Sequence, residues 1–316
     1  MKAAFVFPGQ GAQYVGMGKE LYDSFEIVRR IFDKASEILG EDFVSLVFNG
    51  NEDELKKTEN TQPAILMVCT AISELLMQQG ICPAVTAGLS LGEYSALVAA
   101  RSIDYEDALP LVRKRGRLMN DAVPSGKGTM AAVLGLDEDT LLSCCREASE
   151  YGIAGIANYN CPGQLVITGE VKAVERASEL AMKAGAKRVV PLQVSGPFHS
   201  VLLKSAGDAL AEELAGIKIA APRIPVVSNV TARPIEGTDE LRQLLARQVS
   251  SPVRWEDSIR YMISQGVDTF IEVGPGRTLS GFIKKIDRTA AVYNAEDRAS
   301  FENVLEALSR GKEACI

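Results

Sequence analysis

Residues 88–92 read Gly88-Leu89-Ser90-Leu91-Gly92 and form the pattern Gly-x-Ser-x-Gly. An apolar run ending in Val85-Thr86-Ala87 precedes them, and Glu93 begins a stretch typical of a helix. The pattern therefore lies at a strand-to-helix turn, the context of a nucleophile elbow. Such a tight turn strains the backbone at the serine and needs glycine on both sides to avoid collisions. The sequence predicts an exposed serine hydroxyl at a helix N-terminus, where free N–H groups favour developing negative charge. The alternative is a serine that only caps the helix.

The alternation of strands and helices around this turn predicts the fold. Strands are expected up to Phe7 and over 85–87, 224–228, 268–273 and 290–293. Helices are expected over 20–39, 64–79, 93–100, 105–122, 205–215, 239–248, 255–265, 279–286 and 301–308. Such alternation implies a mostly parallel sheet with helices on both faces. Together with the serine elbow, it predicts an α/β fold with an α/β-hydrolase-like core.

Between residues 126 and 195 the pattern changes to a compact alternation. It predicts strands over 130–136, 153–158, 164–168 and 188–194, and helices over 137–151 and 171–184. The order β-α-β-β-α-β is that of a ferredoxin-like unit, whose two ends lie close together. We therefore expect a large α/β catalytic subdomain formed by 1–125 and 196–316, with 126–195 inserted as a ferredoxin-like small subdomain.

Composition disfavours several classes of protein. The 316 residues carry a net charge of −7, which argues against binding to nucleic acid or to an anionic membrane. No apolar run approaches the ~20 residues of a membrane span, and the N-terminal apolar segment breaks at Pro8-Gly9, so it is a poor signal peptide. We therefore expect a cytoplasmic protein. Six cysteines without a Cys-x-x-Cys pair, and a single histidine, predict no metal site.

A serine nucleophile needs a base within hydrogen-bond reach, most often a histidine. The chain has only His199, within Gly196-Pro197-Phe198-His199-Ser200. Loops often present functional side chains, so we interpret His199 as the general base; the alternative is a structural histidine. No acid between Ser90 and His199 has a spacing that identifies it as the group that orients the imidazole.

Six segments in this order resemble the motifs of malonyl-CoA:acyl-carrier-protein transacylases, the acyltransferase family of fatty-acid and polyketide synthesis. Together they span nearly the whole chain, and six ordered motifs are far more specific than the elbow alone. The segments are Phe7-Pro8-Gly9-Gln10-Gly11-Ala12-Gln13, Gly88 to Leu97, Arg115-Gly116-Arg117-Leu118-Met119, Asn158-Tyr159-Asn160-Cys161-Pro162-Gly163-Gln164, Gly196 to Ser200 and Glu272-Val273-Gly274-Pro275-Gly276.

The resemblance implies a ping-pong acyl transfer that supplies malonyl groups for fatty-acid biosynthesis. Ser90 would attack the thioester of malonyl-CoA while His199 takes its proton, and the malonyl-serine ester would then pass to the phosphopantetheine thiol of holo acyl carrier protein. The resemblance also implies that the backbone N–H groups of Gln10 and Leu91 hold the oxyanion. The backbone carbonyl of Gln248 would orient His199, and no cofactor is implied.

The resemblance further implies a substrate pocket that contains Arg115, Met119, Asn160 and Phe198. Malonate carries a free carboxylate, and a guanidinium offers two parallel N–H donors that match it. Without the resemblance, Arg115 would be assigned to a solvated helix face with the basic residues at 113, 114 and 117. Phe198 would narrow the pocket against an α-methyl branch.

One residue departs from the family pattern. Leu89 stands where the family commonly has a histidine before the nucleophile. Leucine cannot donate a hydrogen bond there, so we expect the local polarity and the rate to differ.

The resemblance also implies how the partner binds. We expect a monomer whose acidic carrier protein docks on a basic patch near the mouth of the cleft. This patch would comprise Lys187, Arg188, Lys284 and Lys285.

Three other interpretations stay open. A malonyl acyltransferase of a polyketide pathway would share every motif. A serine thioesterase or lipase would use the same elbow, but it has no need for a buried cation facing its acyl pocket. A carrier-protein docking module with an inactive site would keep the basic surface and need neither Ser90 nor His199.

Overall fold

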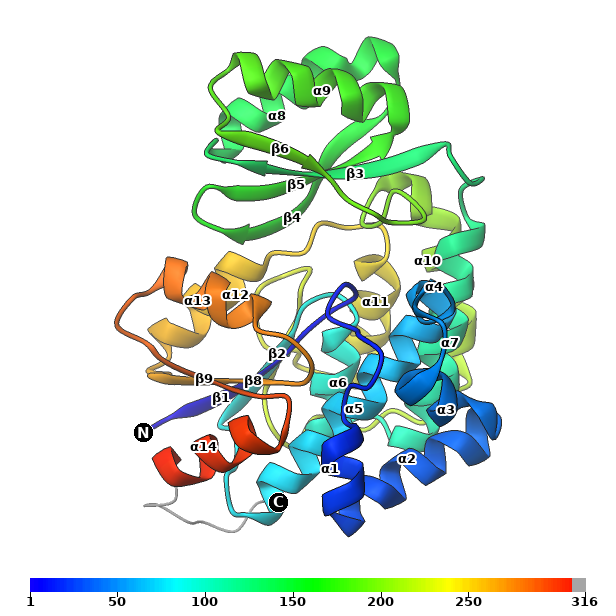
Figure 1. Ribbon diagram of the computed structural model, residues 1–316. Coiled ribbons are helices and arrows are strands. Elements are labelled where there is room, and N and C mark those ends of the chain that lie inside the picture. Colours follow the sequence, from blue (N-terminus) through cyan, green and yellow to red (C-terminus); the bar gives the residue numbers. More distant parts are fainter. Residues whose placement is uncertain (309–316) are drawn as a thin grey trace.

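The computed structural model describes residues 1–308 and contains two β-sheets, one above the other in Figure 1. The larger sheet has five parallel strands in the order β7-β2-β1-β8-β9. These are β1 (Ala3–Phe7), β2 (Val85–Gly88), β7 (Val226–Val227), β8 (Thr269–Val273) and β9 (Ala291–Ala295). The central strands β1 and β8 are buried along their whole length, as expected for parallel strands that are covered on both faces.

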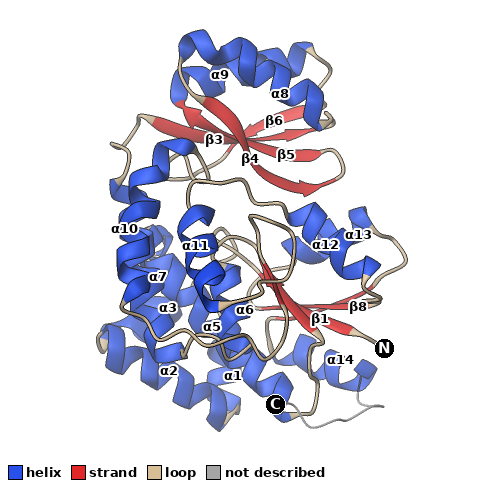
Figure 2. Ribbon diagram, turned by 180° about the vertical axis from the view of Figure 1, so that it is seen from behind, coloured by secondary structure: helices blue, strands red, loops and turns tan. Residues whose placement is uncertain are grey.

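The two faces of this sheet pack against separate helix layers (Figures 1 and 2). Phe5 and Phe7 of β1 contact one core and Ala4 and Val6 contact the other, because successive strand side chains point to opposite faces. The larger core includes α1 (Lys19–Ser24), α2 (Glu26–Leu39), α3 (Asp42–Asn49), α5 (Thr58–Gln78), α6 (Gly92–Ala99), α7 (Tyr105–Asp121), α10 (Lys204–Ala215), α11 (Thr238–Gln248) and α14 (Arg298–Leu308). The short helix α4 (Glu52–Lys56) adds Leu55 to it. The smaller core includes α12 (Trp255–Ser264) and α13 (Thr278–Ile286).

The helix α5 lies at the centre of the larger layer. Most of its 21 residues are buried, in agreement with the apolar run that predicts a helix over 64–79. The helix begins at Thr58 rather than at Ala64, so Pro63 lies inside it. Pro63 is the sixth residue of this helix, so it lacks the N–H that would otherwise donate to the carbonyl of Glu59. The helix predicted over 64–79 therefore begins six residues earlier than expected.

The single helix predicted over 20–39 is two helices. Phe25, between α1 and α2, has an extended backbone with φ −128° and ψ 125°. Its ring packs against Phe301 of α14, with 5.5 Å between the ring centroids. The break in the helical pattern at Phe25 thus coincides with the packing of its ring on Phe301, which is distant in sequence. No prediction covered α3 and α4.

The smaller sheet lies at the top of Figure 1 and is antiparallel, in the order β4-β5-β3-β6. Two helices cover one of its faces and form a core with it. The elements are β3 (Gly128–Leu134), α8 (Glu138–Glu147), a 3₁₀ turn (Ala148–Tyr151), β4 (Ala154–Cys161), β5 (Gln164–Glu170), α9 (Val171–Lys183) and β6 (Arg188–Pro191). All six elements predicted over 130–194 are present, although β6 ends at Pro191. The division of the chain at residues 125 and 196 stays a prediction.

A loop before α12 attaches the smaller sheet to the larger part. Val253 N donates to Ala157 O at 2.8 Å, and Tyr159 N donates to Val253 O at 2.9 Å. The uncovered face of the sheet, with Asn158 and Asn160, therefore lies over the carboxyl ends of β1 and β2. Ligands of open α/β sheets bind at such strand ends.

Within residues 1–308, no helix has both the length and the apolar character needed to cross a membrane. Cys315 lies outside the described residues.

Candidate active site

Ser90 lies in the turn between β2 and α6. Its φ of 53° is in the left-handed region that residues with a side chain rarely adopt. A Cβ on Gly88 would overlap the backbone of Gly92 and Glu93, and a Cβ on Gly92 would overlap the carbonyl of Phe7. Both glycines are therefore required by the close approach of backbone segments. The predicted strand-turn-helix around Ser90 is confirmed.

His199 contacts Ser90 directly. Its Nε2 lies 2.8 Å from Ser90 Oγ, and its Nδ1 lies 2.9 Å from the backbone carbonyl of Gln248. A carbonyl oxygen only accepts, so Nδ1 carries the proton and Nε2 is free to accept the serine proton. Burial, followed by the positive charge of Arg115, lowers the pKa of His199 to about 4. The imidazole is therefore neutral at pH 7, as a general base must be.

Arg115 is buried beside the serine, with 1% of its surface exposed. Its Nη2 donates to Ser90 Oγ at 3.2 Å and to Gln248 Oε1 at 2.9 Å, and its Nη1 donates to Gln62 Oε1 at 2.8 Å. The guanidinium also lies 5.4 Å from the ring centroid of Tyr94. The interpretation of Arg115 as part of a solvated face is wrong.

Helical spacing is the signal that could have placed Arg115 in the interior. Leu111, Arg115 and Met119 follow each other at intervals of four, and all three are buried on one face of α7. The neighbouring basic residues at 113, 114 and 117 are at least partly exposed. Arg115 therefore belongs to the buried face of α7, although the basic residues around it in the sequence favoured an exposed position.

Two further polar residues hold the elbow, and sequence reasoning assigned a role to neither. Asn229 Nδ2 donates to Gly88 O at 2.6 Å, and Asn229 Oδ1 accepts from Ser90 N at 2.6 Å. Glu93 Oε2 accepts from Asn229 N at 3.0 Å and from Gln248 Nε2 at 2.7 Å. Glu93 directly follows the elbow motif and could have been noticed. Asn229 follows the short strand β7 and carries no local signal.

The backbone at Gln10 and Leu91 offers free donors beside the nucleophile. In the part of the chain that the structure describes, neither N–H has a hydrogen-bond acceptor. Leu89 N, by contrast, donates to Phe7 O at 3.0 Å, which holds the Gln10 loop against the elbow. Ser90 N donates to Asn229 Oδ1 and is therefore not available to a substrate. The two unpaired N–H groups are therefore available to an oxyanion.

A cavity of about 290 Å³ joins these groups. Of the nine predicted site residues, eight line it: Gln10, Ser90, Leu91, Arg115, Met119, Asn160, Phe198 and His199. Gln248 lies behind the cavity, against His199 and Arg115. The buried Oδ1 of Asn160 has no hydrogen-bond partner within residues 1–308. Leu89 also lines the cavity and packs against the smaller core.

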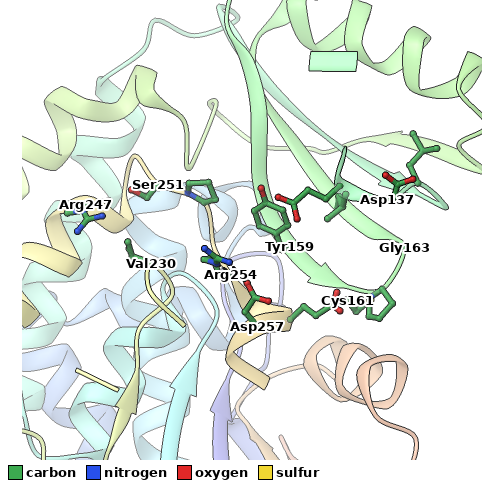
Figure 3. A pocket seen from close by; sticks show the side chains of 15 residues that line it. Asp137, Tyr159, Cys161, Gly163, Val230, Arg247, Ser251, Arg254 and Asp257 are labelled. Atoms are coloured by element: carbon green, nitrogen blue, oxygen red, sulfur yellow. Dashed lines mark hydrogen bonds and ion pairs between the residues drawn. The ribbon is translucent and has the colours of Figure 1, made fainter. Parts of the chain in front are cut away.

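A second, larger cavity of about 510 Å³ contains none of the predicted site residues (Figure 3). Tyr159 and Cys161 of β4 face it, whereas Asn158 and Asn160 face the cavity of Ser90, because strand side chains alternate. Arg254 in its wall is paired with Asp257 at 2.7 Å. This cavity is larger than the first, but the single histidine of the chain lines the first cavity and not this one.

Within residues 1–308, no group of three or more His, Cys, Asp or Glu residues is arranged to hold a metal ion. The arrangement around Ser90 instead combines a serine hydroxyl, a neutral imidazole, two N–H donors without acceptors and a buried guanidinium. These are the parts needed for acyl transfer from a substrate that carries a negative charge.

Known proteins of similar sequence and structure cover almost the whole chain. The family model described as acyl transferase domain matches residues 4–307. A malonyl CoA-acyl carrier protein transacylase of Bacillus subtilis (strain 168) is 48% identical over 308 residues, with 97% of each chain covered. An acyl carrier protein S-malonyltransferase structure from Vibrio cholerae has a TM-score of 0.93 and 45% identity, with 96% of this chain and 100% of that chain covered. A malonyl-transacylase in complex with a type II PKS acyl-carrier protein has a TM-score of 0.95 and 44% identity, with 97% of this chain and 100% of that chain covered.

Proposed function

The chain belongs to the acyl transferase family, and we propose that it moves a malonyl group from malonyl-CoA to the thiol of holo acyl carrier protein through an ester on Ser90. One observation carries this proposal. A buried guanidinium, that of Arg115, donates a hydrogen bond to the same Ser90 Oγ that His199 Nε2 contacts. The nucleophile is thus placed between its base and a cation that matches a carboxylate.

In the first half of the reaction, Ser90 Oγ attacks the thioester carbonyl of malonyl-CoA and its proton passes to His199 Nε2. The developing oxyanion is held by the N–H groups of Gln10 and Leu91. The C–S bond then breaks, and His199 returns the proton to the sulfur of CoA. The carbonyl of Gln248, which accepts from Nδ1, stabilises the imidazolium formed in between.

In the second half, the phosphopantetheine thiol of the carrier attacks the malonyl-serine ester. His199 takes the thiol proton and then protonates Ser90 Oγ as the C–O bond breaks. The two halves use the same groups in reverse order, so Ser90 relays the acyl group between two thiols. No step requires a cofactor.

Arg115 is proposed to bind the free carboxylate of the malonyl group. Its present acceptors, the amides of Gln62 and Gln248 and the hydroxyl of Ser90, are all neutral. A carboxylate accepts more strongly than a neutral amide, so the substrate can compete for the guanidinium. Met119, Asn160 and Phe198 would complete the acyl pocket, with Phe198 limiting its width.

The carrier is proposed to dock where the two sheets meet at the cavity rim. Lys187 lies over Gly135, whose N–H donates to Gly163 O at 2.8 Å. The next residue, Gln164, lines the cavity and accepts from Lys285 Nζ at 3.1 Å. This chain of contacts supports a basic patch of Lys187, Arg188, Lys284 and Lys285 beside the cavity.

We also propose the finer points of the architecture. The antiparallel order β4-β5-β3-β6 with two helices on one face supports a ferredoxin-like small subdomain over 126–195. The elbow after β2 of a parallel sheet supports an α/β-hydrolase-like core over 1–125 and 196–316. A monomeric, cytoplasmic enzyme is our proposal as well, and gel filtration of the free protein tests the monomer.

The buried cation argues against a simple hydrolase, and the assembled nucleophile and base argue against a docking module with an inactive site. Fatty-acid biosynthesis is the pathway we propose; a malonyl acyltransferase of a polyketide pathway shares every motif and remains the alternative.

A single-turnover experiment with malonyl-labelled malonyl-CoA separates these functions. We expect the label to appear on holo carrier and little free malonate to form when the carrier is absent. Rapid release of malonate without the carrier would indicate a hydrolase. Failure of label transfer with a folded protein would indicate a docking module. Ser90→Ala serves as the matched control and should transfer no label.

A further inference from the structure

Glu93 is a buried acid that the mechanism above does not use. Its exposed fraction is 0%, and its Oε2 accepts from Gln248 Nε2 and from Asn229 N, which are both neutral donors. Burial raises the pKa of Glu93 to about 7, although Asn229, Gln248 and Arg115 all act to lower it. A carboxyl group in this position can change its charge in the range where the enzyme works.

The amide of Gln248 lies between Glu93 and Arg115. Its Nε2 donates to the carboxylate at 2.7 Å, and its Oε1 accepts from Arg115 Nη2 at 2.9 Å. The two buried charges are therefore one amide apart and do not touch. The guanidinium therefore has only uncharged acceptors, which a substrate carboxylate can displace, while its charge still acts on Glu93.

The other groups packed around Glu93 are neutral in the working range. On its own helix, burial raises the pKa of Tyr94 to about 12, and across the site burial lowers that of His199 to about 4. Ser228 and Asn229 from the segment after β7, and Gln248 from α11, carry no charge. Arg115 on α7 is thus the charge that balances Glu93 within the described residues.

We propose that Glu93 is a specificity-determining residue, the counter-charge of Arg115 in the empty pocket, and that it takes up a proton from solvent when the malonyl carboxylate pairs with Arg115. The inference rests on the proposed function, because it requires malonyl at Arg115. A second anion at the guanidinium offsets the attraction that keeps Glu93 ionised. The carboxylates of Glu93 and of the malonyl group are both negative. Two such charges about 10 Å apart, at an effective dielectric constant of about 20, change an equilibrium constant by on the order of tenfold.

The sign of the pH effect follows directly. Raising the pH through the pKa of Glu93 places a negative charge near the malonyl carboxylate and disfavours malonyl. An acetyl group has no carboxylate and does not feel this charge. The preference for malonyl over acetyl should therefore fall as the pH rises.

The test measures the rate constant for acylation of Ser90 by limiting malonyl-CoA and acetyl-CoA, from about pH 6 to about pH 9. Both substrates carry the same CoA phosphates, whose titration cancels in the ratio. In the wild type, we expect the malonyl-to-acetyl ratio to fall by about tenfold over this range. Glu93→Gln keeps an acceptor for Gln248 and Asn229, so its ratio should stay flat at the high value. Glu93→Asp keeps an acid and should retain the fall.

Glu272→Gln is the matched control. Glu272 is also a fully buried acid whose pKa is raised by burial, but it accepts from Leu279 N and Ser280 N at the start of α13. Its removal should leave the fall of the ratio unchanged.

A flat ratio in a wild-type enzyme that loads malonyl would overturn the role of Glu93, as would a Glu93→Gln variant that retains the fall. If Glu93→Gln does not fold, the profiles of the wild type and of Glu93→Asp decide alone. A wild type that forms no malonyl-serine would overturn the proposed function instead.

Discussion

His199 Nε2 lies 2.8 Å from Ser90 Oγ, and both residues have left-handed backbones, with φ of 58° and 53°. Only four residues other than glycine have a positive φ within residues 1–308, and these two belong to one site. Conformations of this kind cost about 1–3 kcal/mol each and persist where the surrounding structure holds them. The surrounding contacts at Gln248 and Asn229 are what hold this pair in contact.

The pH dependence of acylation should reflect the buried imidazole. Because burial and Arg115 lower the pKa of His199 to about 4, the base stays unprotonated well below the ordinary value of 6.5. We expect the acid limb of the acylation rate with acetyl-CoA, whose acyl group carries no charge, to have its midpoint near pH 4. A midpoint near 6.5 would contradict the buried, neutral base.

The lowered pKa of His199 also makes the free energy of unfolding depend on pH. The folded pKa lies below that of the unfolded chain, so His199 contributes stability that is present above pH 6.5 and is lost as the pH falls toward 4. Urea unfolding over this range, compared between the wild type and His199→Gln, measures the contribution. The variant should lose less stability than the wild type.

Arg115→Ala should shift the preference from malonyl toward acetyl thioesters. Removing a charge-assisted pair with the carboxylate costs about 1.5–3 kcal/mol, which corresponds to about 10–100-fold in acylation by malonyl-CoA. Arg115→Lys keeps the positive charge without the two parallel donors, so its preference for malonyl should lie between those of the wild type and of Arg115→Ala. The measurement is the ratio of kcat/KM for the two thioesters, and an unchanged ratio would rule out the carboxylate assignment.

Asn229→Ala should slow acylation, although Asn229 does not contact the cavity. The substitution removes the partners of Gly88 O and Ser90 N, and we expect a loss of about 1–3 kcal/mol in unfolding free energy with a lower kcat. Thr231→Ala, on the exposed turn just beyond it, is the control and should retain both values. Wild-type acylation by Asn229→Ala would show that the elbow holds its shape without this residue.

Docking of the carrier should depend on salt. Exposed charge pairs are screened, so the KM for the carrier should rise with ionic strength, and Lys285→Glu should raise it further. Lys34→Glu is the control, because Lys34 is a partly exposed lysine of α2, and α2 lies far from the small sheet in Figure 1. A KM that is insensitive to both salt and Lys285→Glu would contradict the proposed patch.

Features set by local sequence could be predicted. The two glycines around Ser90 predict the elbow, because a side chain at either position would overlap the backbone of a neighbouring segment. The lone histidine could be paired with the serine because no other candidate exists in the chain.

Features set by contacts distant in sequence could not be predicted. The break at Phe25 coincides with packing on Phe301, and the role of Asn229 exists only because β7 lies beside β2. Glu93 and Gln248 are 155 positions apart and carry no joint pattern. Arg115 is intermediate: its helical spacing indicated the interior, but its charge favoured the surface.

The central claim is that Ser90 carries the malonyl group between two thiols. Intact-mass analysis after mixing with malonyl-CoA, followed by peptide mapping and then by addition of holo carrier, tests it directly. We expect one malonyl mass on the peptide containing Ser90, absent in Ser90→Ala, and its complete transfer to the carrier. No adduct, an adduct on another residue, or an adduct that the carrier cannot remove would contradict the account.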